Sequence, residues 1–291
     1  MNLGKVITAM VTPFDEELNI DYKALENLIE HLLKNGTDTV LVAGTTGESP
    51  TLSDKEKLQL FKTCKDIVGS RARIIAGTGS NSTSHSIELS KEAEKIGVDS
   101  LLLVSPYYNK PTQEGLYQHF KSIAEAVDIP VVPYNVPGRT AVTIEPETLA
   151  RLSQIKNIVA VKDAGGNLDK TSKTRVLAPD LAIYSGDDSL TLPMLALGAK
   201  GVISVASHIV GSEIQEMITS FESGNSKKAE EIHLRLHDIF NTLFVITNPI
   251  PVKTALNMID VKVGGLRPPL SAADDKTIKA LENSLKTLEL I

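Results

Sequence analysis

Residues 39–76 read TVLVAGTTGESPTLSDKEKLQLFKTCKDIVGSRARIIA and contain a complete strand, helix and second strand. The run 39–43 is rich in β-branched and apolar residues, which predicts a strand. Ser53 and Glu56 have the spacing of a capping box, which predicts that a helix begins there. Another apolar run at 73–76 predicts the second strand. Because strands separated by a helix pair in parallel, this stretch indicates an α/β fold with a parallel sheet.

The same strand and helix unit recurs along most of the chain. Helical periodicity separates the predicted strands, for example in a helix that Asp21 opens and Gly36 closes. We expect eight strands, at residues 6–13, 39–43, 73–76, 100–104, 131–134, 158–162, 181–185 and 201–206. Eight such units predict a closed (β/α)₈ TIM barrel. The absence of a dinucleotide-binding fingerprint after the first strand argues against a Rossmann fold.

Beyond Gly224 the strand pattern stops and helical periodicity continues. Apolar residues at helical spacing predict one helix over 229–243 and a last one over 278–288. We therefore expect two parts, a (β/α)₈ barrel catalytic domain at residues 1–224 and a small C-terminal α-helical domain at residues 225–291.

Composition restricts the classes of function that the chain can have. The net charge of the 291 residues is −6 and no basic run is present, so nucleic acid and anionic membranes are not expected partners. No secretory signal begins the sequence, and no apolar run approaches the roughly 18 residues of a membrane span. We expect a cytoplasmic protein. Cys64 is the single cysteine, which excludes an internal disulfide and a cysteine-cluster metal site.

Lys162 ends the predicted sixth strand, an unusual place for a hydrated cation. A lysine here can extend its ammonium into solvent or pair with Asp163. Alternatively, burial lowers the pKa of its amine, which then attacks a ketone and forms a Schiff base. The surrounding residues decide between these interpretations.

Polar loops follow several predicted strands, and the carboxyl ends of barrel strands are where active sites form. The Gly-Thr-Thr-Gly-Glu turn at 44–48 is either a plain tight turn or a binding site for a small carboxylate. Tyr107, Tyr108 and Tyr134 are either packing residues or, with the hydroxyl of Thr45, a path for protons.

Arg139 lies in a predicted loop after Pro137-Gly138, where it is either a solvated charge or the cation that binds a substrate carboxylate. Other barrel functions fit the sequence less well. Asp187 and Asp188 follow the seventh strand, where they would repel a phosphate. His233 and His237 have metal-ligand spacing, but they lie on a helix of the C-terminal part, where we expect ordinary surface residues. A non-catalytic binding protein on the same scaffold would not need the lysine, tyrosines and arginine together.

These segments, with Asn-Pro-Ile-Pro-Val-Lys at 248–253, resemble the dihydrodipicolinate synthase family over the whole chain. The family lies within the pyruvate-dependent Schiff-base aldolase superfamily, which includes N-acetylneuraminate lyase. The Gly-x-x-Gly-Glu motif and the strand-six lysine are shared across the superfamily. The Tyr-Asn-Val-Pro-Gly-Arg-Thr segment at 134–140 is narrower.

The resemblance implies a reaction as well as a fold. Lys162 would form a Schiff base with pyruvate, whose carboxylate Thr45 and Thr46 hold. The derived enamine would attack L-aspartate 4-semialdehyde and give 4-hydroxy-tetrahydrodipicolinate, the first committed step of diaminopimelate and lysine biosynthesis. Neither a metal nor an organic cofactor would take part. The alternative is a lyase of the same superfamily that acts on a sugar acid, whose polyol chain would call for neutral groups in place of Arg139.

The resemblance also implies further residue roles and an assembly. Tyr134 and Thr45 would relay protons together with Tyr108 of a neighbouring subunit, and Arg139 would bind the carboxylate of the semialdehyde. The backbone at two further positions would line the pocket, namely Gly186 and Ile203. The expected assembly is a homotetramer built from two tight dimers.

Two features depart from better-known family members. Pro133 precedes Tyr134, where an aliphatic residue is usual. In lysine-inhibited members an acidic side chain occupies the position of His85, and Lys57 adds a second basic group nearby. Two basic groups would repel the ammonium of lysine, although Asp54 offsets part of that charge. We therefore predict weak or absent inhibition by lysine at the corresponding interface pocket, formed by Ser49, Pro50, Asp54, Lys57, Asn81, His85 and Tyr107.

Overall fold

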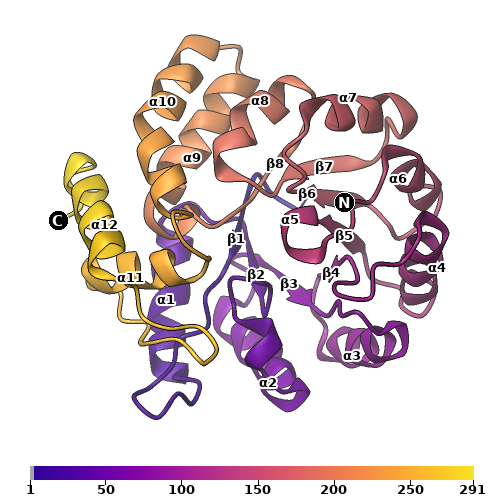
Figure 1. Cartoon of the computed structure of the whole chain (residues 1–291), viewed down its shortest axis with the longest axis horizontal. Helices are drawn as coiled ribbons and strands as arrows, with labels where there is room; N and C mark the ends of the chain where they lie inside the picture. Colours follow the sequence, from indigo (N-terminus) through magenta and orange to yellow (C-terminus); the bar gives the residue numbers. More distant parts are fainter. Residues whose placement is uncertain (1–2) are drawn as a thin grey trace.

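The computed structural model describes residues 3–291. Within these residues, eight parallel strands follow one another in chain order and close into a barrel (Figure 1). The last strand pairs with the first, with Ile203 beside Ile7. The fold prediction is confirmed. The strands are β1 Val6–Ala9, β2 Thr39–Val42, β3 Arg73–Gly77, β4 Ser100–Val104, β5 Val131–Asn135, β6 Ala160–Asp163, β7 Ala182–Ser185 and β8 Gly201–Ser204.

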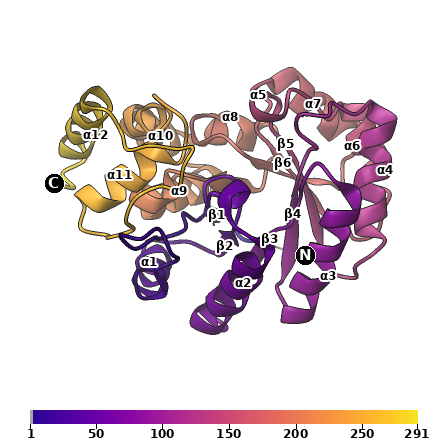
Figure 2. The ribbon, with the colours of Figure 1, turned by 60° about the horizontal axis from the view of Figure 1, so that its bottom comes forward.

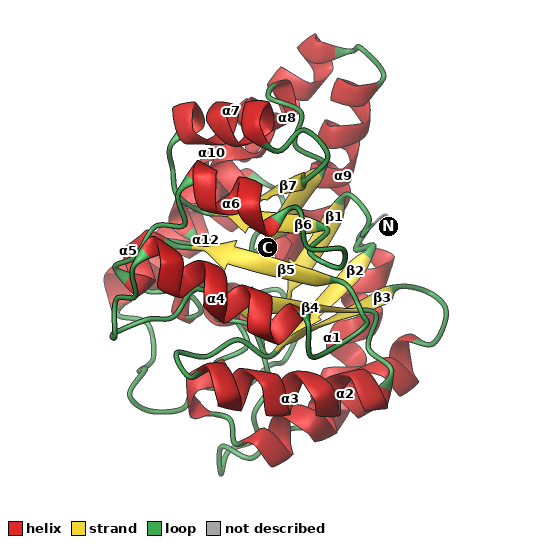
Figure 3. Cartoon of the chain, turned by 90° about the vertical axis from the view of Figure 1, so that its right-hand side faces the viewer, coloured by secondary structure: helices red, strands yellow, loops and turns green. Residues whose placement is uncertain are grey.

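Helices surround the strands on the outside (Figure 3). Their ends follow the expected local chemistry, because the Ser53 and Glu56 capping box is formed at the start of α2, and Gly97 takes the left-handed conformation at the end of α3. The helices of the barrel are α1 Tyr22–Lys34, α2 Asp54–Val68, α3 Thr83–Ile96, α4 Gln113–Ala124, α5 Pro137–Thr140, α6 Pro146–Leu152, α7 Leu168–Leu177, α8 Thr191–Ala196 and α9 Ser207–Glu222, with short 3₁₀ turns at Ser49–Thr51 and Asp188–Leu190.

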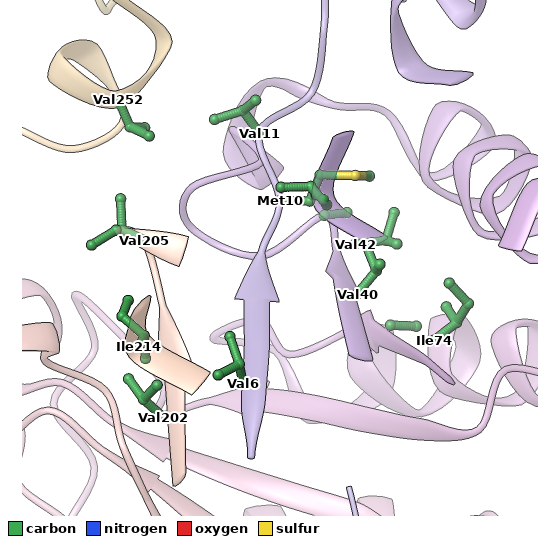
Figure 4. Packing of buried hydrophobic residues seen from close by; sticks show 14 of the residues in the cluster. Val6, Met10, Val11, Val40, Val42, Ile74, Val202, Val205, Ile214 and Val252 are labelled. Carbon is green, nitrogen blue, oxygen red and sulfur yellow. The ribbon is translucent and has the colours of Figure 1, made fainter. Parts of the chain in front are cut away.

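Side chains alternate between two apolar clusters along each strand. In β1, Val6 faces the helices and Ile7 faces the barrel interior. Figure 4 shows Val6 beside Val202 of β8 in the outer cluster, which continues beyond the end of β1 to Val252. Full burial of such a side chain stabilises the fold by about 1.5–3 kcal/mol. The inner cluster contains Leu3, Ile7, Ala9, Leu41, Ile75, Leu102, Val132, Tyr134, Val136, Ala160, Tyr184 and Ile203.

The structure corrects several expected boundaries. β1 ends at Ala9 rather than residue 13, and β8 ends at Ser204 rather than residue 206. β8 stops early because the backbone N–H groups of Val205 and Ala206 donate to the carboxylate of Asp188 instead of continuing the sheet. The segment after Pro137 is the one-turn helix α5 rather than a loop, because its prolyl residue suits the first helical position.

The C-terminal part lies against one side of the barrel (Figures 1 and 2). The expected boundary at residues 224/225 falls in the turn between α9 and α10, and α10 packs on α9 within the outer cluster. The sequence analysis predicted two helices in this part and missed α11, although both prolines of 248–253 lie at its start, where a missing N–H is tolerated. These helices are α10 Ser226–Thr242, α11 Ile250–Met258 and α12 Asp275–Thr287. No helix within residues 3–291 has the length and apolar character needed to cross a bilayer.

Candidate active site

Lys162 lies on β6, between β5 and β7, and its side chain lines the cavity at the carboxyl end of the barrel. In the sheet it pairs with Tyr134 of β5 on one side and with Tyr184 of β7 on the other. Only 5% of its surface is exposed, and its Nζ lies 4.3 Å from the centroid of the Tyr134 ring. A Cβ at Gly186 would lie 3.1 Å from Lys162 Cε and 2.8 Å from the Cβ of Ala164. Glycine at this position therefore leaves room for the lysine side chain.

Burial changes the acid–base behaviour of Lys162. Loss of solvation lowers the pKa of its amine to about 7, while the Asp188 carboxylate partly opposes this shift and the Arg139 guanidinium adds to it. Asp188 is itself fully buried, and burial raises its pKa although the hydroxyl of Ser204 and two backbone N–H groups donate to it. Near neutral pH a large fraction of Lys162 is therefore an uncharged amine, the form that attacks a carbonyl carbon.

Burial shifts the pKa of Tyr134 in the direction opposite to that of Lys162. Burial raises the pKa of its phenol to about 12, against a smaller lowering by Arg139 and with a further rise from Asp187. The phenol therefore keeps its proton near neutral pH. A protonated hydroxyl beside a neutral amine provides a donor for an oxygen that develops negative charge.

A cavity of about 220 Å³ opens at the carboxyl end of the barrel above Lys162. It shares a wall with a larger cavity of about 600 Å³, which extends outward between the loops after β2 and β3. The shared residues are Thr45, Tyr134, Val136 and Arg139. The smaller cavity, in which a ligand carbon can approach Lys162, therefore adjoins the larger one.

The loop at 44–48, which links β2 to the turn before α2, forms one side of the smaller cavity. Its turn is closed by the N–H of Gly47, which donates to the carbonyl of Gly44 at 3.1 Å. The side-chain amide of Asn248 donates to the hydroxyl oxygen of Thr46 at 2.9 Å, and the hydroxyl of Thr12 donates to the carbonyl of Gly47 at 2.7 Å. The loop is thus held from two sides with Thr45 facing the cavity.

Arg139 provides positive charge at the mouth of both cavities. It lies on α5, and its Nη2 donates to the carbonyl oxygen of Asn248 at 3.0 Å. This hydrogen bond uses only part of the guanidinium fork, which has further N–H groups that suit a carboxylate.

A model of the Dihydrodipicolinate synthetase family matches residues 2–288 of the chain. The chain belongs to the dihydrodipicolinate synthetase family. A 4-hydroxy-tetrahydrodipicolinate synthase from Desulforamulus reducens is 52% identical over 293 residues, which cover 100% of this chain and 99% of that relative.

Solved structures of dihydrodipicolinate synthases agree with this assignment. The enzyme from Bacillus anthracis is 49% identical, with a TM-score of 0.96 and 98% of both chains covered. The enzyme from Cyanidioschyzon merolae, solved with lysine bound, is 47% identical, with a TM-score of 0.97 and 99% of both chains covered.

The structure of this family member brings most of the expected site residues together. Around the smaller cavity lie Thr45, Thr46, Tyr134, Arg139, Lys162 and Gly186. Ile203 lies deeper, in the inner cluster, whereas Val205 two residues later lines the cavity. Tyr108 lies apart from this group, because its side chain is 91% exposed on the loop after β4, where its φ is +73°. Pro133 does not shorten β5, which continues to Asn135.

The larger cavity contains the residues expected to form the family's lysine pocket. The Nε2 of His85 lies 2.7 Å from one oxygen of the Asp54 carboxylate, and Lys57 Nζ lies 3.9 Å from the other oxygen. Burial lowers the pKa of Lys57, while Asp54 opposes that shift. Both basic groups therefore compete for the one carboxylate that was expected to offset them. Weak inhibition by lysine remains our prediction.

Sequence reasoning missed residues that the fold brings to the site from far along the chain. Asn248 lines the cavity and holds Thr46, although the sequence used it only as part of a family motif. Phe240 and Phe244 of the segment around the end of α10 also line the cavity. Phe240 was expected on the face of the helix over 229–243, which gave no signal of what that face would contact, and Phe244 lies beyond that expected helix.

Residues 3–291 hold no cluster of three or more histidine, cysteine, aspartate or glutamate side chains placed to bind a metal ion. His233 and His237 lie on α10 with their ring centroids 6.3 Å apart, and His233 is near Phe240. His237 is exposed, as expected of a surface residue, whereas His233 is half-buried, and burial lowers the pKa of its ring.

Proposed function

We propose that the chain condenses pyruvate with L-aspartate 4-semialdehyde to give 4-hydroxy-tetrahydrodipicolinate, the reaction named for its 52% identical relative. The observation that carries this proposal is the buried amine of Lys162, which lies against Tyr134 in a cavity that also contains Thr45, Thr46 and Arg139. Covalent capture of a keto acid needs such an uncharged amine, a proton donor and a carboxylate site.

The first half of the reaction forms the Schiff base. The Lys162 amine adds to the ketone carbon of pyruvate, and Tyr134 supplies the proton that lets the oxygen leave as water. Thr45 and Thr46 hold the pyruvate carboxylate at the 44–48 loop. The Tyr134 phenolate then takes a proton from the methyl carbon of the imine, which regenerates the phenol and leaves an enamine, a carbon nucleophile.

The second half of the reaction joins the two substrates. The enamine carbon attacks the aldehyde of the semialdehyde, whose carboxylate pairs with the Arg139 guanidinium, and the aldehyde oxygen takes a proton from the Tyr134 and Thr45 relay. The amino group of the bound semialdehyde then attacks the imine carbon. This closes the ring and releases the Lys162 amine, so that the catalyst is regenerated without a metal or an organic cofactor.

Tyr108 belongs to this proposal through a second subunit. Its side chain is 91% exposed and lines neither cavity of the site, which leaves it accessible to complete the proton relay in a neighbouring copy of the chain. The proposed assembly is a homotetramer of two tight dimers, with the tight dimer as the catalytic unit. A monomeric dihydrodipicolinate synthase variant that is 42% identical to this chain has been solved.

The test is to trap the covalent intermediate. Borohydride reduction with pyruvate present, followed by peptide mass mapping, is expected to place a reduced pyruvyl adduct on Lys162. Lys162→Ala is the matched control and should leave the protein unlabelled. A coupled assay then compares aspartate 4-semialdehyde with N-acetylmannosamine as acceptor. An adduct on another lysine would overturn the mechanism, and turnover of the sugar alone would overturn the choice of acceptor.

A further inference from the structure

Lys253 and Glu48 form the most buried ion pair among residues 3–291. Lys253 Nζ lies 2.9 Å from Glu48 Oε1, and the two side chains are only 2% and 1% exposed. Lys253 belongs to α11, whereas Glu48 is the last residue of the 44–48 loop. Neither side chain belongs to the group that faces the smaller cavity.

Each charge of this pair has additional partners. Lys253 Nζ donates to the carbonyl of Thr12 at 2.9 Å and lies 4.3 Å from the centroid of the Phe14 ring. The second oxygen of Glu48 accepts a hydrogen bond from the backbone N–H of Arg267 at 2.9 Å. Burying two ions is costly, and an apolar pair of similar size often gives equal or greater stability. The role of this pair therefore lies in the geometry that it imposes on its neighbours rather than in stabilising energy.

Arg267 makes further hydrogen bonds around the same pair of residues. Its guanidinium donates to the carbonyl of Leu18 and to the carbonyl of Thr51, both at 2.9 Å. It also forms an ion pair with Glu56 at 2.6 Å, at the start of α2. The chain between α11 and α12 thus crosses over the segments that follow β1 and β2 (Figure 1).

These contacts hold three consecutive residues of the 44–48 loop, two through their side chains and one through its backbone. Asn248 holds the hydroxyl of Thr46, Thr12 holds the carbonyl of Gly47, and the buried pair holds the side chain of Glu48. Glu48 has φ +57° and ψ 35°, a left-handed conformation that a non-glycine residue adopts only when its surroundings enforce it. Lys253 links two of these contacts, because its ammonium binds both the Glu48 carboxylate and the carbonyl of Thr12, whose hydroxyl donates to Gly47.

We propose that Lys253 and Glu48 are positioning residues that set the affinity for the keto acid by fixing the 44–48 loop, with Arg267 holding the pair in place. The inference rests on the proposed function, in which Thr45 and Thr46 of this loop hold the pyruvate carboxylate. It assigns the C-terminal segment a role in substrate binding, although its charged residues do not touch the substrate. A carboxylate site loses affinity when its donors move by a fraction of an ångström, because hydrogen bonds depend steeply on distance and angle.

The semialdehyde provides an internal control. Its proposed partner, Arg139, lies on α5 and is held by the carbonyl of Asn248 rather than by the buried pair. Loosening the 44–48 loop should therefore raise the KM for pyruvate and leave the KM for the semialdehyde nearly unchanged. General destabilisation of the protein would not separate the two substrates in this way.

The test compares Glu48→Gln with the double variant Glu48→Gln/Lys253→Met. Glu48→Gln keeps the shape of the side chain, so a folded protein is expected. It leaves the buried charge of Lys253 without a counter-ion, which should lower Tm. The double variant also removes the Lys253 charge and should recover part of the lost Tm. We expect the KM for pyruvate to rise about 10-fold in both variants, equivalent to about 1.4 kcal/mol of lost binding. The rate of imine formation at saturating pyruvate should change much less.

Leu281→Ala is the control variant. Leu281 is a buried residue of α12, and its truncation should destabilise the same C-terminal part without changing a contact of the loop. It should lower Tm and leave both KM values unchanged. The inference is overturned if the pyruvate KM stays within about twofold of wild type in both loop variants, or if it follows Tm in all three proteins. Failure of the wild-type protein to form an adduct on Lys162 would instead refute the proposed function.

Discussion

Replacing Lys162 by methionine should make the folded protein more stable while abolishing its activity. The pKa of this lysine falls from an ordinary value of 10.5 to about 7 because the amine is buried. The difference is about 3.5 units, and each unit corresponds to about 1.36 kcal/mol, so the buried lysine destabilises the fold by up to about 5 kcal/mol near neutral pH. Methionine has nearly the same shape and no charge, and should recover much of this energy.

The pH dependence gives the prediction its sign. Between pH 7 and 10.5 the unfolded chain binds a proton at this position that the folded chain does not bind. The stability of the wild-type protein therefore rises with pH through this window, and the full penalty is present below pH 7. The advantage of Lys162→Met should shrink by about 1.4 kcal/mol for each pH unit and lose about 2 kcal/mol between about pH 7.5 and pH 9.

The assay is denaturant unfolding of both proteins at several pH values and at one fixed protomer concentration, because assembly also contributes to apparent stability. Lys62→Met serves as the control, since Lys62 is an exposed residue of α2. Its difference from wild type should stay flat with pH. Equal or lower stability of Lys162→Met at neutral pH would refute the argument that the fold keeps this amine desolvated for chemistry.

Further predictions concern the other groups of the site. Tyr134→Phe should lower kcat about 100-fold or more by removing the proton donor, with intact folding checked by circular dichroism. Arg139→Ala should raise the KM for the semialdehyde about 10- to 100-fold and the KM for pyruvate far less, because it removes a charge-assisted hydrogen bond worth about 1.5–3 kcal/mol; equal effects on both substrates would contradict its assignment. Tyr108→Phe should be inactive alone, and mixing it with Lys162→Ala should restore some activity in re-assembled dimers; no recovery would count against a relay shared between subunits. Low millimolar lysine should leave the wild-type rate unchanged, whereas His85→Glu should gain inhibition; strong inhibition of the wild type would overturn our account of that pocket.

The sequence alone determined the order and type of most elements. Strand and helix periods are local properties, so the repeat at 39–76 and its recurrences predicted the parallel barrel, and the capping box at Ser53 predicted the start of α2. One of the wrong boundaries has a distant cause that local patterns do not show. Asp188 ends β8 early by accepting the N–H groups that would have continued the sheet, and nothing near residues 201–206 indicates this.

The sequence also placed Lys162 at a strand end, but it left open whether the lysine is solvated. Only the closed barrel decides this, because the burial that lowers its pKa comes from strands and loops that meet through long-range packing. The contacts that shape the 44–48 loop have the same origin. Asn248 lies 202 residues from Thr46 and Lys253 lies 205 residues from Glu48. A local pattern encodes which element a residue joins, whereas the environment of its side chain depends on chain segments that become neighbours only when the barrel closes.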